Sequence, residues 1–238
     1  MATIEHIDTN ALARDLRPAG IAGWAATVML IGGAILTSSV GALPEPAFDA
    51  PAAEIQRYLQ TQSATAMAVG GFTIAFGLCA LLWFVCGLSA ALRRSGARPE
   101  WLPTVVLVSG TAAVAALLTG APQATAFRGG DGLAAQLAQF AQFAFDLSNI
   151  TFANMWVALG SLSLASGWAI LSGRAAPHAP GLPARPAWPA WLGWWALAVG
   201  VGFLLARTVW TTWVWGIPYA PFWVWVLVVS TRMLRTRR

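Results

Sequence analysis

Lysine is absent from this sequence, and only 10% of its 238 residues are charged. Soluble domains carry roughly 25% charged residues, because their surfaces must be hydrated. With 58% apolar residues, the chain has too few charged side chains to cover a soluble fold of its length. The composition therefore excludes an ordinary soluble domain and indicates an integral membrane protein.

Cysteine and histidine are also scarce. Cys79 and Cys86 lie seven residues apart in one apolar stretch, a spacing that places them on one helix face but too far apart for a disulfide. We expect both to be small buried residues. His6 and His178 lie outside every apolar stretch, which argues against a haem or metal centre held by histidine in the membrane. No cofactor and no metal site are predicted.

Reactive motifs are missing as well. The sequence has no HExxH, no glycine-rich phosphate loop and no paired carboxylates within an apolar stretch. Residues 164–167, read LASG, loosely resemble the GxSG of rhomboid proteases, but the first glycine is absent and no span carries a histidine to act as base. We therefore predict that the protein is not an enzyme.

Apolar stretches dominate what is present. Six of them are separated by polar or proline-rich segments: residues 21–40, 63–92, 102–118, 147–171, 188–206 and 219–231. About 20 helical residues cross the hydrocarbon core, so the last stretch is short. Tilt, local thinning of the bilayer or a helix that begins within the aromatic residues before it would reconcile its length. We predict an all-α integral membrane protein, a bundle of six transmembrane helices over residues 21–231, built as three helical hairpins.

The two ends of the chain flank this transmembrane domain. Residues 1–20 are expected to form a cytoplasmic N-terminal tail, and residues 232–238 a basic cytoplasmic tail. The first span also fits a secretory signal peptide, with a small-residue cleavage pattern at 40–42. The long acidic leader before this span favours an uncleaved helix.

Arginine positions predict the orientation, because cytoplasmic loops carry an excess of basic residues. With both termini inside, the inner segments hold Arg14, Arg17, Arg93, Arg94, Arg98, Arg174, Arg185, Arg232, Arg235, Arg237 and Arg238. Only Arg57, Arg128 and Arg207 fall outside. We therefore predict an N-in, C-in topology.

Both longer outer loops carry an amphipathic pattern. Ile55, Tyr58 and Leu59 share one face of residues 52–60. In residues 133–144, the apolar face holds Leu133, Leu137, Phe140 and Ala144, and Asp131 is the expected N-cap. We predict two short outer helices at the interface, the second running into the fourth span.

Tryptophans cluster at the ends of the spans, where their rings favour the headgroup level. Arginine and proline precede three of these entries, at positions 17–18, 98–99 and 185–186. Proline fits the first turn of a helix. The predicted interface anchors are Trp188, Trp191, Trp194, Trp210, Trp213 and Trp223.

Small residues spaced four apart predict close helix packing in lipid. They occur as Gly33-Thr37-Gly41, Ala66-Gly70, Ala112-Ala116-Gly120 and Ala198-Gly202-Ala206. The third and fifth spans are favoured as packing elements, because three small residues line up in each of those two motifs.

Asp146, Asn149 and Asn154 form the candidate polar site, near the outer end of the fourth span. Polar groups at membrane depth usually face the bundle interior or a water-filled cavity. One interpretation is a polar pocket that opens outward; the other is a helix end at the headgroups. Arg207 ends the fifth span on the same side, where we expect it either to approach Asp146 or to extend to the surface.

Residues 189–194, read PAWLGW, resemble an entry motif of small six-helix polytopic membrane proteins of bacteria, many of them actinobacterial, whose function is unassigned. The closing run 221–234 and the triplet 92–94 are similar too. This resemblance covers most of the chain in layout and implies a six-helix membrane protein, without a catalytic residue to carry over. The Ala-, Gly-, Pro- and Arg-rich composition also indicates a bacterial origin, hence the cytoplasmic membrane.

The leading functional hypothesis is a non-catalytic multi-pass membrane protein, an accessory or partner-binding subunit of a membrane complex. The alternative is a small transporter or channel with its site around Asp146, Asn149 and Asn154, and a lipid-modifying enzyme ranks third. Expected partners are the lipid bilayer and a membrane protein or a second copy of the chain. Nucleic acid is not expected, because the arginines flank spans instead of forming a basic stripe.

Overall fold

The computed structural model describes residues 9–38, 43, 45–127, 138–175, 188–209 and 213–235, and the structural statements below concern these residues. They form helices and turns, with no strand among them. The elements are α1 (Thr9–Ser38), α2 (Ala52–Thr61), α3 (Ala64–Arg94), α4 (Leu102–Phe127), α6 (Ala138–Ala175), α7 (Ala190–Thr208), the 3-10 turn η1 (Trp213–Trp215) and α8 (Gly216–Arg235). All except α2 and η1 are long and apolar enough to cross a membrane. The all-α class and the six membrane-length helices are therefore confirmed.

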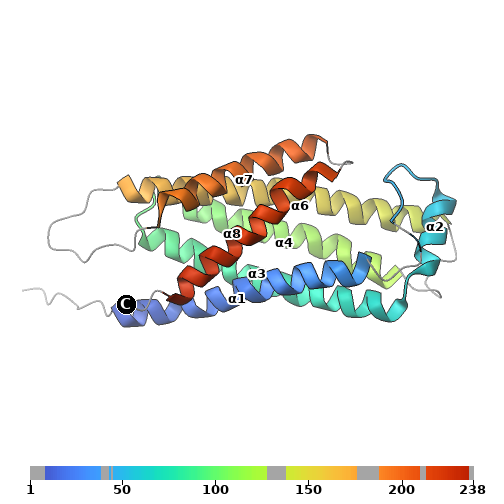
Figure 1. Ribbon diagram of the computed structural model, residues 1–238, viewed down its shortest axis with the longest axis horizontal. Helices are drawn as coiled ribbons and strands as arrows, with labels where there is room; N and C mark the ends of the chain where they lie inside the picture. Colours follow the sequence, from blue (N-terminus) through green and yellow to red (C-terminus); the bar gives the residue numbers. More distant parts are fainter. Residues whose placement is uncertain are drawn as a thin grey trace, which may run out of the picture.

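The six long helices form a ring in which each packs against its neighbours in the sequence (Figure 1). The α1–α3 and α4–α6 pairs are the most closely packed, and α8 closes the ring on α1. α7 packs more extensively against α6 than against α8. α8, in turn, packs more extensively against α1 than against α7. The expected third hairpin is therefore splayed, and α8 runs obliquely from the end of α7 to the first half of α1 (Figure 1).

Glycines allow the closest helix contacts, as expected where lipid offers no hydrophobic drive for helix association. A β-carbon added at Gly33 of α1 would lie 2.7 Å from Ile74 of α3. One added at Gly167 of α6 would lie 2.6 Å from the carbonyl oxygen of Gly193 of α7. Any larger residue at these positions would push the paired helices apart.

Only some residues of the predicted small-residue motifs lie at contacts between helices. A β-carbon at Gly70 would meet Thr37, which confirms the motifs of the first two spans as packing faces. Ala112 and Ala198, expected to line contacts of the third and fifth spans, are instead exposed. α7 packs on α6 through its glycines, Gly200 among them. Gly41 and Gly120 lie outside the residues whose surroundings are described.

The short helix α2 is amphipathic, as predicted. Its buried face consists of Ile55, Tyr58 and Leu59, which pack against Ala141 and Phe145 of α6. From Ala138 onward the chain is one continuous helix into the fourth span, which confirms that part of the second prediction. The earlier part of that segment, residues 133–137 with Asp131 before it, lies outside the described residues.

Two helix ends refine the predicted spans. α8 begins directly after η1 and has 20 residues, so the sixth span reaches membrane length by starting within the aromatic segment, one of the three predicted solutions. α1 begins at Thr9, so the second half of the expected N-terminal tail is helical and continuous with the first span.

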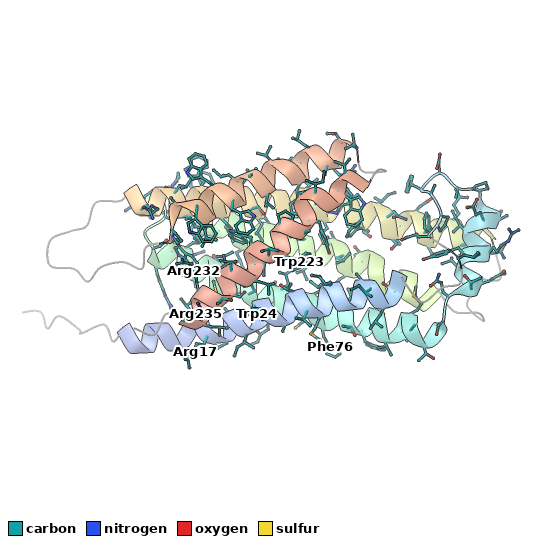
Figure 2. All side chains as sticks on the ribbon, viewed as in Figure 1. Arg17, Trp24, Phe76, Trp223, Arg232 and Arg235 are labelled. Atoms are coloured by element: carbon teal, nitrogen blue, oxygen red, sulfur yellow. The ribbon has the colours of Figure 1, made fainter. Side chains whose placement is uncertain are left out.

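Basic and acidic side chains lie mainly at opposite ends of the bundle. Of the arginines expected inside, those with described side chains lie at the end opposite α2: Arg17, Arg93, Arg94, Arg98, Arg174, Arg232 and Arg235. Figure 2 labels three of them there, Arg17, Arg232 and Arg235. The side of α2 holds Glu45, Asp49, Glu54 and Asp146, with Arg57 and Arg207, whereas Glu100 lies at the opposite end beside Arg98. We call these the arginine end and the α2 end. The remaining arginines of the topology prediction lie outside the described side chains: Arg14, Arg128, Arg185, Arg237 and Arg238.

The cysteines correct one prediction. Cys79 and Cys86 are exposed, whereas burial was expected. The buried face of α3 is set by Leu78, Leu81 and Val85, and both cysteines fall on the opposite face of the helix.

Candidate functional site

A cavity of about 490 Å³ opens inside the ring near the α2 end. Its walls come from α1, α3, α4, α6 and α8, together with η1, and residues 45–48 and Tyr58 cover it from the α2 end. Ligand pockets typically enclose about 300–1,000 Å³ and are lined mainly by apolar and aromatic side chains. The size and location of this cavity make it the candidate functional site.

Aromatic rings form one wall of the cavity. Phe152 of α6 lies edge-on to Trp156, Trp215 and Tyr219, with ring centroids 5.3, 5.3 and 5.8 Å away. Trp156 stacks on Trp215 at 6.0 Å, and Tyr219 meets Trp223 edge-on at 5.8 Å. Such ring pairs contribute about 0.5–1.5 kcal/mol beyond the area they bury. The cluster therefore holds the start of α8 against α6, although α7 and α8 are splayed.

Two indole N–H groups on this wall are unsatisfied. Nε1 of Trp156 and Nε1 of Trp223 are buried without a hydrogen-bond partner, although buried indoles usually have one. Trp225, two residues further along α8, donates a hydrogen bond to the carbonyl oxygen of Leu192 at 3.1 Å. The wall is thus mainly aromatic, with hydrogen-bond donors at its indole N–H groups.

Between the cavity and the arginine end, side chains fill the interior of the ring. The deepest lining residues are Leu81 of α3 and Leu159 of α6. Toward the arginine end they are followed by a continuous apolar core that includes Leu88, Leu92 and Ile170. In the part of the chain that the structure describes, the cavity is therefore a blind pocket confined to the α2 half of the bundle.

Most of the polar side chains that line the cavity lie at its α2 end. Thr37, Glu45, Ser148 and Asn149 line the cavity at the α2 end. The amide nitrogen of Asn149 donates to the carbonyl oxygen of Phe145 at 2.9 Å, which fixes the side chain against its own helix. The cavity thus changes from polar at its rim to apolar at its floor.

The predicted polar site is divided between two places. Asn149 lines the cavity, whereas Asp146, one turn away, is half-buried and does not. Asn154 is exposed, and its Oδ1 accepts a hydrogen bond from Nη2 of Arg207 at 3.3 Å. Asp146 and Asn154 are eight residues apart on α6, about 12 Å along the axis, so Arg207 contacts Asn154 and not Asp146.

The predicted interface tryptophans also differ among themselves. Trp191 and Trp194 lie on the outer surface of α7, 48% and 64% exposed. Trp188 is half-buried, and its carbonyl oxygen accepts a hydrogen bond from Arg174 at 3.0 Å. Trp223 lies inside the bundle, 3% exposed, on the wall of the cavity (Figure 2). Trp210 and the side chain of Trp213 lie outside the described part.

Four aromatic residues of the cavity wall were not predicted as site residues: Phe152, Trp156, Trp215 and Tyr219. A signal for them is present, because residues 215, 219 and 223 are spaced four apart and share one face of a helix. That spacing predicts an aromatic stripe on the start of α8, but it does not reveal which helix the stripe faces.

Comparison of the chain with protein-family models, curated proteins and solved structures found no match. The resemblance carried by residues 189–194 therefore stays a prediction. The function has to be inferred from the geometry of the cavity.

Proposed function

We propose that the chain is a non-catalytic accessory protein of the bacterial cytoplasmic membrane that binds a small apolar or amphipathic molecule in the cavity at the α2 end. The observation that carries this proposal is the polarity of the cavity, with its aromatic wall, its leucine floor and its rim of Thr37, Glu45, Ser148 and Asn149. Such a gradient matches a molecule with an apolar body and one polar end.

The proposed topology places both termini in the cytoplasm and the α2 end outside. The arginine end supports it, since basic residues are retained on the cytoplasmic side. In this orientation six helices cross the membrane, and the cavity lies in the outer half of the bilayer.

Binding is favoured over transport because the ring is filled toward the arginine end, below Leu81 and Leu159. Of the polar residues expected to form a transport site, only Asn149 lines the cavity. A blind pocket suits retention of a ligand better than its passage across the bilayer.

A photoactivatable ten-carbon alcohol tests the binding function. The alcohol carries a diazirine, and the purified protein in lipid nanodiscs is irradiated with it and digested for mass spectrometry. We expect labelling of the segments around Leu78 and Met155, which line the cavity. Labelling confined to exposed residues such as Phe76, which is 64% exposed, would contradict the proposal.

A matched pair of variants sharpens this test. Ala34→Trp adds bulk to the cavity wall, whereas Ala115→Trp adds the same bulk at an exposed position of α4 that does not line the cavity. Overpacking costs about 1–3 kcal/mol, so cavity labelling should fall roughly fivefold or more in the first variant only. Equal labelling in both variants would show that the label does not report on the cavity.

A further inference from the structure

α1 and α8 meet only near the arginine end. There, a β-carbon at Gly20 would lie 2.8 Å from the carbonyl oxygen of Ser230, and Nε1 of Trp24 donates to Oγ1 of Thr231 at 3.2 Å. From this crossing the two helices separate toward the α2 end (Figure 1).

The cavity occupies the space between the separating helices. Leu30, Ala34 and Thr37 of α1 form one wall, and Tyr219 and Trp223 of α8 form another. Both helices are long and apolar enough to cross a membrane. The side of the cavity that lies between them therefore faces the hydrocarbon core of the bilayer.

Access from the aqueous side is covered. Residues 45–48 and Tyr58 line the cavity from the α2 end, and α2 is anchored by Ile55 and Leu59, both fully buried against α6. Between α1 and α8, the part of the chain that the structure describes places no helix over the cavity, which leaves this side for a ligand that comes from the membrane.

The depth of the cavity corresponds to one leaflet. Asn149 at the rim and Leu159 at the floor are ten residues apart on α6, about 15 Å along the helix axis. The hydrocarbon core is about 30 Å thick, so the cavity spans about half of it. Its polar rim then lies at the headgroups, and its apolar floor near the bilayer midplane.

We infer that the ligand is a phospholipid of the outer leaflet, one acyl chain of which enters sideways between α1 and α8 and extends down the aromatic wall. The headgroup stays at the rim formed by Glu45, Ser148 and Asn149. This inference rests on the proposed binding function and on the proposed orientation, and it adds the class of ligand and its route of entry.

Photolabelling from within the bilayer tests the inference. The full chain is placed in nanodiscs of phosphatidylethanolamine, a small fraction of which carries a diazirine near the end of one acyl chain. After irradiation, adducts are expected on the floor of the cavity, at Leu78, Leu81 and Leu159, in addition to the exposed outer surface. Ala34→Trp should lower the floor adducts by about fivefold or more, whereas Ala115→Trp should leave them unchanged.

A second cavity variant guards against misfolding of the first. Leu117→Trp adds bulk to another wall, on α4, and should lower the same adducts. Each variant is compared with the wild type by gel filtration, and only a variant with a wild-type elution profile is scored.

Two outcomes separate this inference from the proposed function. If the ten-carbon alcohol labels the cavity floor and the phospholipid does not, the binding function stands and the lipid inference is overturned. If neither probe labels the floor, both are overturned. Floor adducts that remain unchanged in both cavity variants would also overturn the inference, because the label would then have reached those residues by another route.

Discussion

Single glycines allow two helices to lie close together where they cross, and the space around each glycine determines whether a side chain is tolerated there. A β-carbon at Gly23 would overlap the Ser230 hydroxyl and the Phe84 ring, whereas one at Gly32 would meet nothing within 4 Å. The two positions belong to the same helix and differ in what lies opposite them, so they offer a matched comparison.

Gly23→Ala should therefore destabilise the α1–α8 crossing by about 1–3 kcal/mol, the usual cost of overpacking. Gly32→Ala should be neutral or stabilising by up to about 1 kcal/mol, because alanine favours a helix over glycine. Thermal unfolding in detergent measures both. A lower midpoint for Gly32→Ala than for Gly23→Ala would contradict the crossing as described.

The buried indoles offer a second comparison. Trp225 donates a hydrogen bond to Leu192, whereas the N–H of Trp156 has no partner. Trp225→Phe should cost about 1 kcal/mol more than Trp156→Phe, because only the first substitution removes a hydrogen bond. Thermal unfolding of the two variants side by side tests this, and equal midpoints would argue against the difference.

Among the helices, α2 stands apart because its apolar contacts form a cluster separate from the main core. Ile55→Ala should release α2 from α6 at a local cost of about 2–5 kcal/mol, with little change in the overall unfolding midpoint. Hydrogen exchange should accelerate in residues 52–61 and stay slow in α3. Glu54→Ala, at an exposed position of the same helix, is the control, and equal exchange in the two variants would refute the separate anchoring of α2.

The path of α8 is the feature of the fold that creates the cavity. Because α8 starts on α6 through its aromatic stripe and ends on α1 at Ser230, it crosses the bundle obliquely. A helix that ran parallel to α7 as a regular hairpin would not diverge from α1 in this way. The splayed pair thus links the packing of the helices to the proposed site.

For the molecule as a whole, the separation of charge predicts its orientation in the membrane. With Cys79 and Cys86 replaced by alanine, Ala53→Cys in α2 should react with a membrane-impermeant maleimide in intact cells. Arg235→Cys at the arginine end should react only after the cells are permeabilised. Reaction of Arg235→Cys from outside would reverse the topology and would place the cavity in the inner leaflet.

Much of the architecture can be read from local composition. Apolar stretches of about 20 residues require helices in lipid, because the backbone has no other hydrogen-bond partners there. The buried face of α2 follows in the same way from the spacing of Ile55, Tyr58 and Leu59. Such short-range patterns are sufficient to predict these features, because each feature depends only on the residues of one segment.

The arrangement around the cavity depends on contacts between distant parts of the chain. Gly20 and Ser230 are 210 positions apart, and the burial of Trp223 and the exposure of Cys79 and Cys86 follow from which helices become neighbours. Hydropathy predicts which segments enter the membrane, and the hydropathy of a segment depends on that segment alone. It contains no information about which faces of two apolar helices meet, because in lipid these faces are selected by the shape of the side chains and not by their polarity.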